Sequence, residues 1–121
     1  MIGIGADLVD IGRFRRSLVR SPGLCDRLFR PNEQAYAERQ SDPTERYGGR
    51  FASKEAVLKA LGLGLGGIAM YDIEVIRTDS GAPSLLLHGD AARVSANAGV
   101  TGWLVTISHT ETLAQAVVVA R

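Results

Sequence analysis

Two carboxylates and a group of cations are the residues of this sequence best suited to chemistry. Asp7 interrupts a short run of apolar residues and glycines, a place where aspartate is usually depleted because such strands lie inside the fold. Glu55 lies in a second segment together with Arg50, Lys54 and Lys59. Mg²⁺ takes hard oxygen ligands, typically one or two carboxylates completed by waters and substrate phosphates. Asp7 and Glu55 are therefore candidate metal ligands, and the three cations are candidate phosphate partners.

Each of these residues also has a purely structural interpretation. Asp7 can be an aspartate whose hydrogen bonds are satisfied at a strand end. Glu55 and Lys59 can form an ordinary i,i+4 helix pair, worth only about 0.3–0.5 kcal/mol. Lys54 falls within the apolar stripe of its own segment, where an ammonium is costly unless it reaches water or meets an anion. The spacing alone leaves the structural and the chemical interpretations open.

Two polar or glycine-rich segments are further candidates. Ser108, His109 and Thr110 end a predicted strand just before a turn, where they either serve the turn or bind a ligand. The glycines from Gly62 to Gly67 follow a predicted helix and lead to a strand, which is the reverse of a dinucleotide-binding fingerprint. They form either a helix end with a flexible connector or a loop over a ligand.

The composition of the whole chain limits the possible functions. Its 121 residues suit one domain, residues 1–121, and 45% hydrophobic with 22% charged residues is typical of a globular protein. A net charge of +1 disfavours a nucleic-acid-binding protein. Cys25 is the single cysteine, so an intrachain disulfide and a cysteine-based zinc site are excluded. No apolar run approaches the ~20 residues of a membrane span, and no signal-peptide pattern precedes Asp7, so we expect a cytoplasmic protein.

These candidate residues need a mixed fold to position them. The hydrophobic pattern predicts strands over residues 2–9, 71–78, 84–88, 103–109 and 113–120, and helices over 11–21, about 24–29, 31–39, 44–61 and 90–98. Asp10 and Asp90 are the expected N-caps of two of these helices, and Gly62 is the expected residue just beyond the longest one. On the first strand Asp7 lies on the face opposite Ile4. The order indicates a single α+β domain in which a mainly antiparallel sheet packs against a long central helix.

One helix carries a basic face. Arg13, Arg16 and Arg20 recur at helical spacing in the segment after Asp10. Such a face is either solvated or complementary to an acidic partner.

Several segments, in order along the chain, resemble the holo-acyl-carrier-protein synthases, the small type of 4′-phosphopantetheinyl transferase. The matching segments are Gly3–Ile11, Gly49–Ala56 continuing through Lys59–Gly62, Asp72–Val75, the Gly81-x-Pro83 turn, Val105–Thr110 and Ala114–Ala116. The resemblance covers essentially the whole chain. The stretch from Glu33 to Arg46 shows little of the pattern, and no role is assigned to it.

The resemblance implies an enzyme with the 4′-phosphopantetheinyl transferase fold. It would transfer the 4′-phosphopantetheine arm of coenzyme A to a serine of apo acyl carrier protein and release adenosine 3′,5′-bisphosphate, in fatty acid or polyketide biosynthesis. Such a transfer depends mainly on positioning and charge stabilisation. Relatives are commonly homotrimers with coenzyme sites in clefts between subunits.

The resemblance also implies roles for particular residues. Asp7 and Glu55 would hold Mg²⁺ against the coenzyme pyrophosphate. The coenzyme-binding residues would be Arg50, Lys54, Lys59, Gly62, Ser108, His109 and Thr110. The acidic helix of the carrier would meet Arg13, Arg16 and Arg20. Glu55, Lys54 and Asp10 would act in the reaction, and the serine proton would go to Glu55, to Asp10 through a water, or to a water on the metal.

Two other functions would use the same residues. A Mg²⁺-dependent nucleotide or pyrophosphate hydrolase would release 3′,5′-ADP without modifying a carrier. A trimeric module that only binds coenzyme A or a carrier protein would leave the mass of the carrier unchanged.

Overall fold

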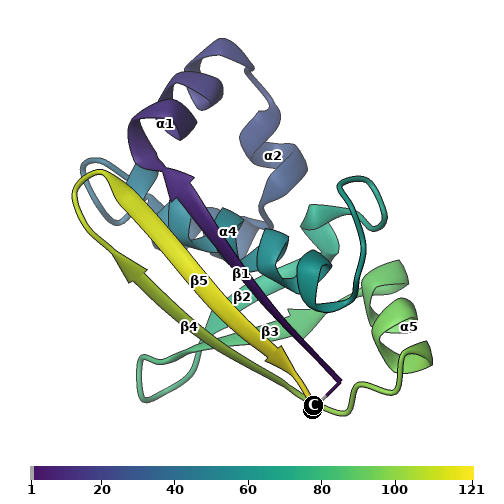
Figure 1. Cartoon of the computed structure of the whole chain (residues 1–121). Helices are drawn as coiled ribbons and strands as arrows, with labels where there is room; N and C mark the ends of the chain where they lie inside the picture. Colours follow the sequence, from purple (N-terminus) through teal and green to yellow (C-terminus); the bar gives the residue numbers. More distant parts are fainter. Residues whose placement is uncertain (1) are drawn as a thin grey trace.

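The computed structural model describes residues 2–121, so that of the expected domain only Met1 lies outside it. The elements are β1 (Gly3–Asp10), α1 (Ile11–Arg20), α2 (Leu24–Leu28), α3 (Pro31–Ala37), α4 (Thr44–Ala60), a 3₁₀ turn (Met70–Asp72), β2 (Ile73–Arg77), β3 (Pro83–Leu87), α5 (Gly89–Asn97), β4 (Trp103–His109) and β5 (Leu113–Ala120) (Figure 1). None of the helices within residues 2–121 is long and apolar enough to cross a membrane.

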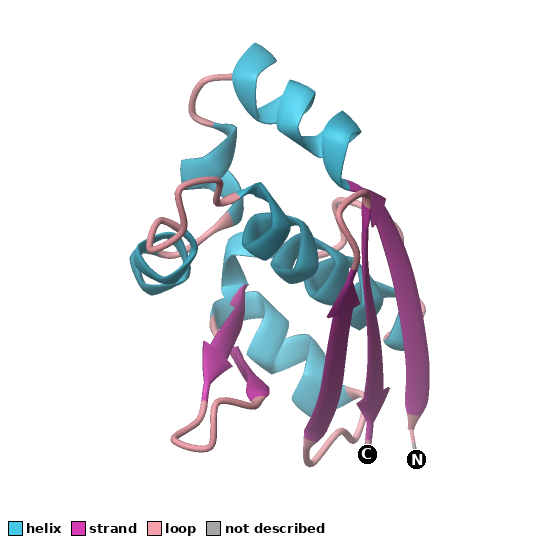
Figure 2. Cartoon of the chain, turned by 90° about the vertical axis from the view of Figure 1, so that its left-hand side faces the viewer, coloured by secondary structure: helices cyan, strands magenta, loops and turns pink. Residues whose placement is uncertain are grey.

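The strands form two antiparallel sheets around the long helix. One sheet has the order β1-β5-β4, and the other is the β2–β3 hairpin. Figure 2 shows helices between the three-stranded sheet and the hairpin. Among them α4 packs on β1 and β5 and also contacts β2. The predicted α+β class with a long central helix is confirmed, with the antiparallel strands divided between two sheets.

The contact between β1 and α4 is close because both elements carry small residues. A Cβ atom added at Gly5 would collide with the carbonyl oxygen of Ala56, and one added at Gly3 would collide with that of Ala60. Successive side chains of a strand alternate between its faces, so Gly3, Gly5 and Asp7 share the inward face. The two glycines therefore bring the backbone of β1 against α4 and set Asp7 beside this helix.

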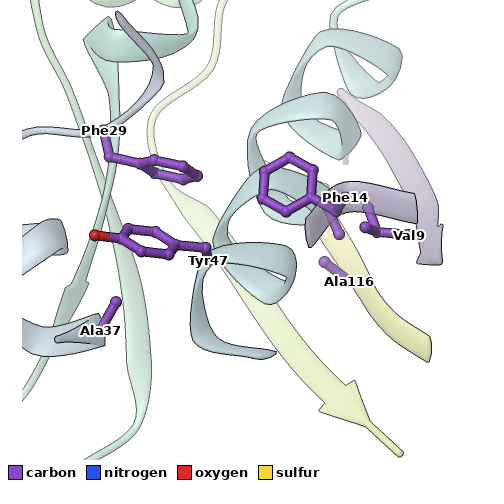
Figure 3. Close-up of a cluster of buried hydrophobic side chains, with 7 residues drawn as sticks. Val9, Phe14, Phe29, Ala37, Tyr47 and Ala116 are labelled. Atoms are coloured by element: carbon purple, nitrogen blue, oxygen red, sulfur yellow. The ribbon is translucent and has the colours of Figure 1, made fainter. Parts of the chain in front are cut away.

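Two clusters of buried apolar side chains hold the layers together. In the first, Phe14 of α1 packs edge-on against Phe29, with ring centroids 6.5 Å apart, and Phe29 lies 4.8 Å from the ring of Tyr47 on α4 (Figure 3). The second cluster surrounds the C-terminal half of α4 and includes Val57, Ile68, Ile73, Ala91 and Val118. The aromatic contacts fix α1 and the chain after α2 against the N-terminal half of α4.

Three residues were predicted to lie at helix ends, and the structure confirms two of them. Oδ1 of Asp10 accepts a hydrogen bond from the Arg13 backbone N–H at 2.9 Å, which confirms Asp10 as the N-cap of α1. Gly62 follows the end of α4 with a φ of 72°, as expected for a glycine just beyond a helix. The prediction for Asp90 is wrong, because α5 begins at Gly89 with His88 as its N-cap. Nε2 of the His88 ring lies 2.8 Å from Glu74, and the backbone N–H of His88 donates to the Asp72 carbonyl.

Candidate functional site

A cleft of about 640 Å³ is lined mainly by residues of β1, α1, α2 and α4. Its polar side chains include Asp7, Asp10 and Glu55, and we call it the carboxylate cleft. Its apolar lining includes Phe14, Leu24, Leu28, Phe51 and Met70. The cleft therefore joins a cluster of carboxylates to a wall able to accept an apolar group.

The carboxylates of this cleft influence each other. The side chain of Asp7 is 13% exposed, and its Oδ1 lies 2.9 Å from the ammonium of Lys59, which also donates to the Ala6 carbonyl. Burial raises the pKa of Glu55, and the negative charge of Asp7 raises it further, while Lys59 opposes the shift. The hydrogen bond to Asp7 raises the pKa of Lys59. The site thus holds two like charges against a single exposed ammonium.

This arrangement fits a divalent cation bound by few protein ligands. Residues 2–121 contain no group of three or more histidine, cysteine, aspartate or glutamate side chains that could hold a metal. Asp7 and Glu55 offer two carboxylates in one cleft, which matches Mg²⁺ ligated by one or two carboxylates and completed by other oxygens. The mutual repulsion of the two carboxylates would be relieved by such an ion.

The basic face of α1 opens beside the carboxylate cleft. Arg13 lines this cleft, and Arg16 and Arg20 are exposed on the same helix. None of these three arginines forms an ion pair within the described part of the chain. Arg15, by contrast, is bound to Asp42 at 2.7 Å. The three predicted arginines are therefore available to a partner.

Lys54 lies inside the protein, and here the structure contradicts the sequence-based prediction. Its side chain is 0% exposed, and its ammonium donates to Glu33 at 2.9 Å, to the Met70 carbonyl at 3.0 Å and to the Ile73 carbonyl at 2.6 Å. Burial lowers the pKa of Lys54, and the Glu33 carboxylate opposes that shift. An ammonium has three donors, and all are used. Lys54 thus has no donor left for a coenzyme phosphate or for the reaction.

A second cleft of about 580 Å³ carries most of the positive charge of the site. It is lined by Arg46, Arg50, Arg77, His109 and Tyr36, and we call it the arginine cleft. Arg50 is only 4% exposed, and its buried Nε has no hydrogen-bond partner within residues 2–121. Burial lowers the pKa of Arg50, and the charges of Arg77 and Arg46 add to that effect while Tyr36 and Glu33 oppose it. Clustered guanidinium groups without a carboxylate partner suit an anion, and phosphate in particular.

The predicted phosphate partners are thus divided among three places. Arg50 lines the arginine cleft, Lys59 lies with Asp7, and Lys54 is internal. Helix geometry separates Arg50 from Lys59, because each residue turns the direction by ~100° and these two residues therefore point ~180° apart. Lys54 is separated from both by its buried bond to Glu33. Gly62, predicted to bind the coenzyme, lines neither cleft.

A depression of about 200 Å³ shares lining residues with each of the two clefts. It is lined by Ser108, His109 and Thr110 together with Leu8 and Leu113 of the carboxylate cleft. The Thr110 hydroxyl accepts hydrogen bonds from the backbone of the turn, including that of Leu113 at 3.1 Å. His109 Nδ1 lies 3.4 Å from Glu45 and also lines the arginine cleft. Thr110 thus stabilises the turn, as one of the two interpretations of the sequence expected, and the side chains of Ser108, His109 and Thr110 line the same depression.

Sequence reasoning missed Tyr36, Arg46, Arg77 and Glu33. Glu33 and Tyr36 lie in the stretch without family pattern, and Arg77 comes from the hairpin. Only the folded chain brings Glu33, Tyr36 and Arg77 to α4, so no spacing along the sequence relates them to it, whereas Arg46 lies on α4 itself, four residues before Arg50. The unexplained lysine in an apolar stripe was a usable signal for Glu33, because a buried ammonium requires an anion.

Comparison with known proteins agrees with the motifs. The model of the 4′-phosphopantetheinyl transferase superfamily matches residues 3–117. The holo-[acyl-carrier-protein] synthase of Clavibacter sepedonicus is 49% identical over 117 residues, covering 97% of this chain and 92% of that protein. The synthase of Streptomyces avermitilis is 46% identical over 120 residues, covering 99% and 97%.

Solved structures share the fold over the full length. The holo-[acyl-carrier-protein] synthase of Neisseria meningitidis superimposes with a TM-score of 0.91 at 26% identity, covering 100% of this chain and 98% of that one. The Helicobacter pylori synthase in complex with coenzyme A gives a TM-score of 0.85 at 28% identity, covering 98% and 99%. The resemblance predicted from the motifs is thus confirmed, and the chain belongs to the 4′-phosphopantetheinyl transferase superfamily.

Proposed function

We propose that this protein transfers the 4′-phosphopantetheine arm of coenzyme A to a serine of an apo acyl carrier protein, with Mg²⁺, in fatty acid or polyketide biosynthesis. The names of its relatives and the coenzyme A bound to the Helicobacter pylori synthase support the substrates. The observation that carries the proposal is that Asp7 and Glu55, distant in sequence, line one cleft beside Lys59.

The reaction forms one bond and breaks one. The serine Oγ bonds to the β-phosphorus of coenzyme A, and the bond from that phosphorus to the leaving 3′,5′-ADP breaks. Asp7 and Glu55 would hold Mg²⁺, which when bound supplies positive charge that stabilises the pyrophosphate oxygens. Lys59 is held by Asp7 with 53% of its side chain exposed, so its ammonium is placed to meet phosphate at the same cleft.

Asp10 is the proposed acceptor of the serine proton. It lines the carboxylate cleft, and only its Oδ1 is used in capping α1. The other carboxylate oxygen is left to accept a proton from a hydroxyl in the cleft. Arg13 lines the same cleft, so an acidic carrier helix docked on α1 would present its serine next to Asp10.

The arginine cleft is proposed to bind the phosphate group that coenzyme A carries on its ribose. Arg46, Arg50 and Arg77 supply the charge, and Ser108 and His109 line the depression beside this cleft. The phosphate would meet guanidinium groups that form no ion pair with a carboxylate within residues 2–121.

A homotrimer is proposed because the outer face of the three-stranded sheet is apolar. Ile4 and Leu104 are 61% and 49% exposed, and both pair with Val119 in register, so that they form one apolar row. Leu8 and Leu113, which line the carboxylate cleft, are also exposed. Packing of a second subunit on this face would bury the row and place the partner beside the cleft.

Mass spectrometry of apo carrier protein incubated with coenzyme A and Mg²⁺ tests the proposal. We expect the carrier to gain about 340 Da, the mass of the arm joined as a phosphodiester. Asp7→Asn and Glu55→Gln should lose this gain while keeping the wild-type circular dichroism spectrum, and Arg93→Ala on α5 should keep it. Release of 3′,5′-ADP without a change in carrier mass would instead identify a hydrolase, and binding of intact coenzyme A alone would identify a binding module.

A further inference from the structure

We infer that Tyr36 is a positioning residue that holds the guanidinium groups of the arginine cleft together without cancelling their charge. The guanidinium carbons of Arg46, Arg50 and Arg77 lie 4.0, 4.2 and 4.8 Å from the centre of its ring, and that of Arg39 lies at 5.9 Å. Tyr36 is thus the common neighbour of four cations. The identity of the ligand as a phosphate of coenzyme A rests on the proposed function.

The arginine cleft is also lined by two carboxylates, Asp42 and Glu45, but they do not account for this clustering. Asp42 is bound by Arg15 at 2.7 Å, and Glu45 lies 3.4 Å from His109. None of the three closest guanidinium groups forms an ion pair with a carboxylate in the part of the chain that the structure describes. What they share is the ring of Tyr36.

An aromatic ring and a carboxylate would have different effects at this position. Both attract guanidinium groups, but a carboxylate neutralises one of them, whereas the ring attracts through its quadrupole and carries no charge. The ring of Tyr36, which we call the aromatic platform, therefore keeps the full positive charge of the arginines available to a phosphate. Arg46 is held at two points, because it also donates to the backbone carbonyl of Tyr36 at 2.6 Å.

Helix α3 holds the aromatic platform, the ring of Tyr36, in place. Its Glu33 is 1% exposed and binds the ammonium of Lys54 as well as the backbone N–H of Val75 at 3.1 Å. Ala37, next to Tyr36, is fully buried in the core. Glu33 and Ala37 therefore anchor α3, and Tyr36 projects from the same helix to the cleft. The buried ion pair that removes Lys54 from the reaction thus helps to position the phosphate site.

The test compares Tyr36→Leu, which removes the aromatic ring, with Tyr36→Phe, which keeps it. We expect Tyr36→Leu to raise the KM for coenzyme A roughly 10- to 50-fold with kcat within about threefold, because several cation–π contacts are lost at a site used in binding. Tyr36→Phe should restore the KM to within about threefold of the wild type. Tyr71→Leu is the matched control, because it removes a single such contact, to Arg30 at 4.5 Å, away from the cleft.

A measurement on the ligand-free wild type separates this inference from the proposed function. NMR signals of the arginine side chains should include several shifted upfield by the ring current of Tyr36, and these should persist in Tyr36→Phe. Arginine signals without such shifts would overturn the inference even if Tyr36→Leu fails to fold. An unchanged KM in folded Tyr36→Leu, or equal damage in Tyr36→Phe, would also overturn it. If the upfield shifts are present but the protein does not bind coenzyme A, the proposed function is refuted, and the positioning role of Tyr36 is not.

Discussion

At the scale of single residues, Lys54 and Glu33 show how burial decides what a charged group can do. Lys54 stands next to Glu55 in the sequence, yet it points into the core and uses all three donors there. Lys59 is largely exposed and pairs with Asp7 at the cleft. Two lysines of one helix therefore have different functions, one holding α3 and β2 to α4 and the other facing the proposed phosphate.

Lys54→Met should destabilise the protein strongly. The substitution leaves Glu33 buried without its cation, which typically costs about 3–5 kcal/mol. Lys59→Met removes an exposed ion pair and should cost only about 0–1 kcal/mol. Urea denaturation followed by circular dichroism measures both free energies of unfolding. Equal losses in the two variants would contradict a structural role for the buried pair, whereas partial recovery in Lys54→Met/Glu33→Leu would support it.

Asp10→Asn separates the two roles given to Asp10. Asparagine caps helices as well as aspartate does, so the thermal unfolding midpoint should stay near that of the wild type, while Asp10→Ala should lose about 1 kcal/mol. Both variants lack the proton acceptor, and kcat should fall roughly 10²- to 10⁴-fold in each. Stopped assays at saturating coenzyme A and carrier protein measure this effect. An Asp10→Asn variant with wild-type kcat would restrict Asp10 to capping.

At the scale of elements, the close contact of β1 with α4 places Asp7. Gly5→Ala should destabilise the protein by about 1–3 kcal/mol or more, because its Cβ meets the backbone carbonyl of Ala56, which cannot move as a side chain can. Displacement of β1 should also lower transfer activity by shifting Asp7 relative to Glu55. Gly64→Ala is the control, because its Cβ would meet nothing within 4 Å. Equal stability of the two variants would show that β1 does not need this contact.

Helix α1 should act in carrier recognition. Arg13→Ala is expected to raise the KM for carrier protein roughly 3- to 10-fold and to leave the KM for coenzyme A unchanged, because exposed charges at an interface mainly steer encounter. The difference from the wild type should shrink at high salt as the charges are screened. Arg93→Ala on α5 serves as the control. Steady-state kinetics with varied carrier protein would refute the assignment if the two variants behaved alike.

Regular elements were predictable where local signals agreed. The strands of residues 103–109 and 113–120 have the predicted bounds, and the cap at Asp10 and the glycine after α4 are confirmed. Asp90 failed as a cap because α5 begins before it, at Gly89, with His88 as the N-cap. Strand alternation predicted that Asp7 and Ile4 lie on opposite faces of the first strand, but only the structure shows that the face of Asp7 packs against α4.

At the scale of the whole molecule, the site could be predicted only in part. Asp7 and Glu55 were related through motifs, and the structure places both in one cleft. The arginine cleft could not be foreseen, because Tyr36, Arg50 and Arg77 come from three elements and meet only after the hairpin packs near α3 and α4. The internal position of Lys54 depended in the same way on a partner in another helix. Long-range contacts thus set the limit of sequence reasoning here.

The division of the site between two clefts predicts that each coenzyme is bound by residues of two neighbouring subunits. In a ring of identical subunits, each interface brings one part of a chain against a different part of its neighbour. We expect one coenzyme to use the carboxylate cleft of one subunit and the arginine cleft of the next, across the apolar outer face of the sheet. Such a site needs Glu55 from one chain and Arg50 from another.

Mixed oligomers of Glu55→Gln and Arg50→Met chains test this expectation. Each variant alone should be nearly inactive at low coenzyme A concentration, but equal coexpression should regain about a quarter of the wild-type activity, because that fraction of interfaces joins two intact clefts. Mixtures of Asp7→Asn and Glu55→Gln should regain nothing, because both residues belong to the same cleft of the same chain. Activity assays on oligomers purified by size exclusion decide between the two arrangements. If the first mixture also stays inactive while both variants assemble, each coenzyme is bound by the two clefts of a single chain.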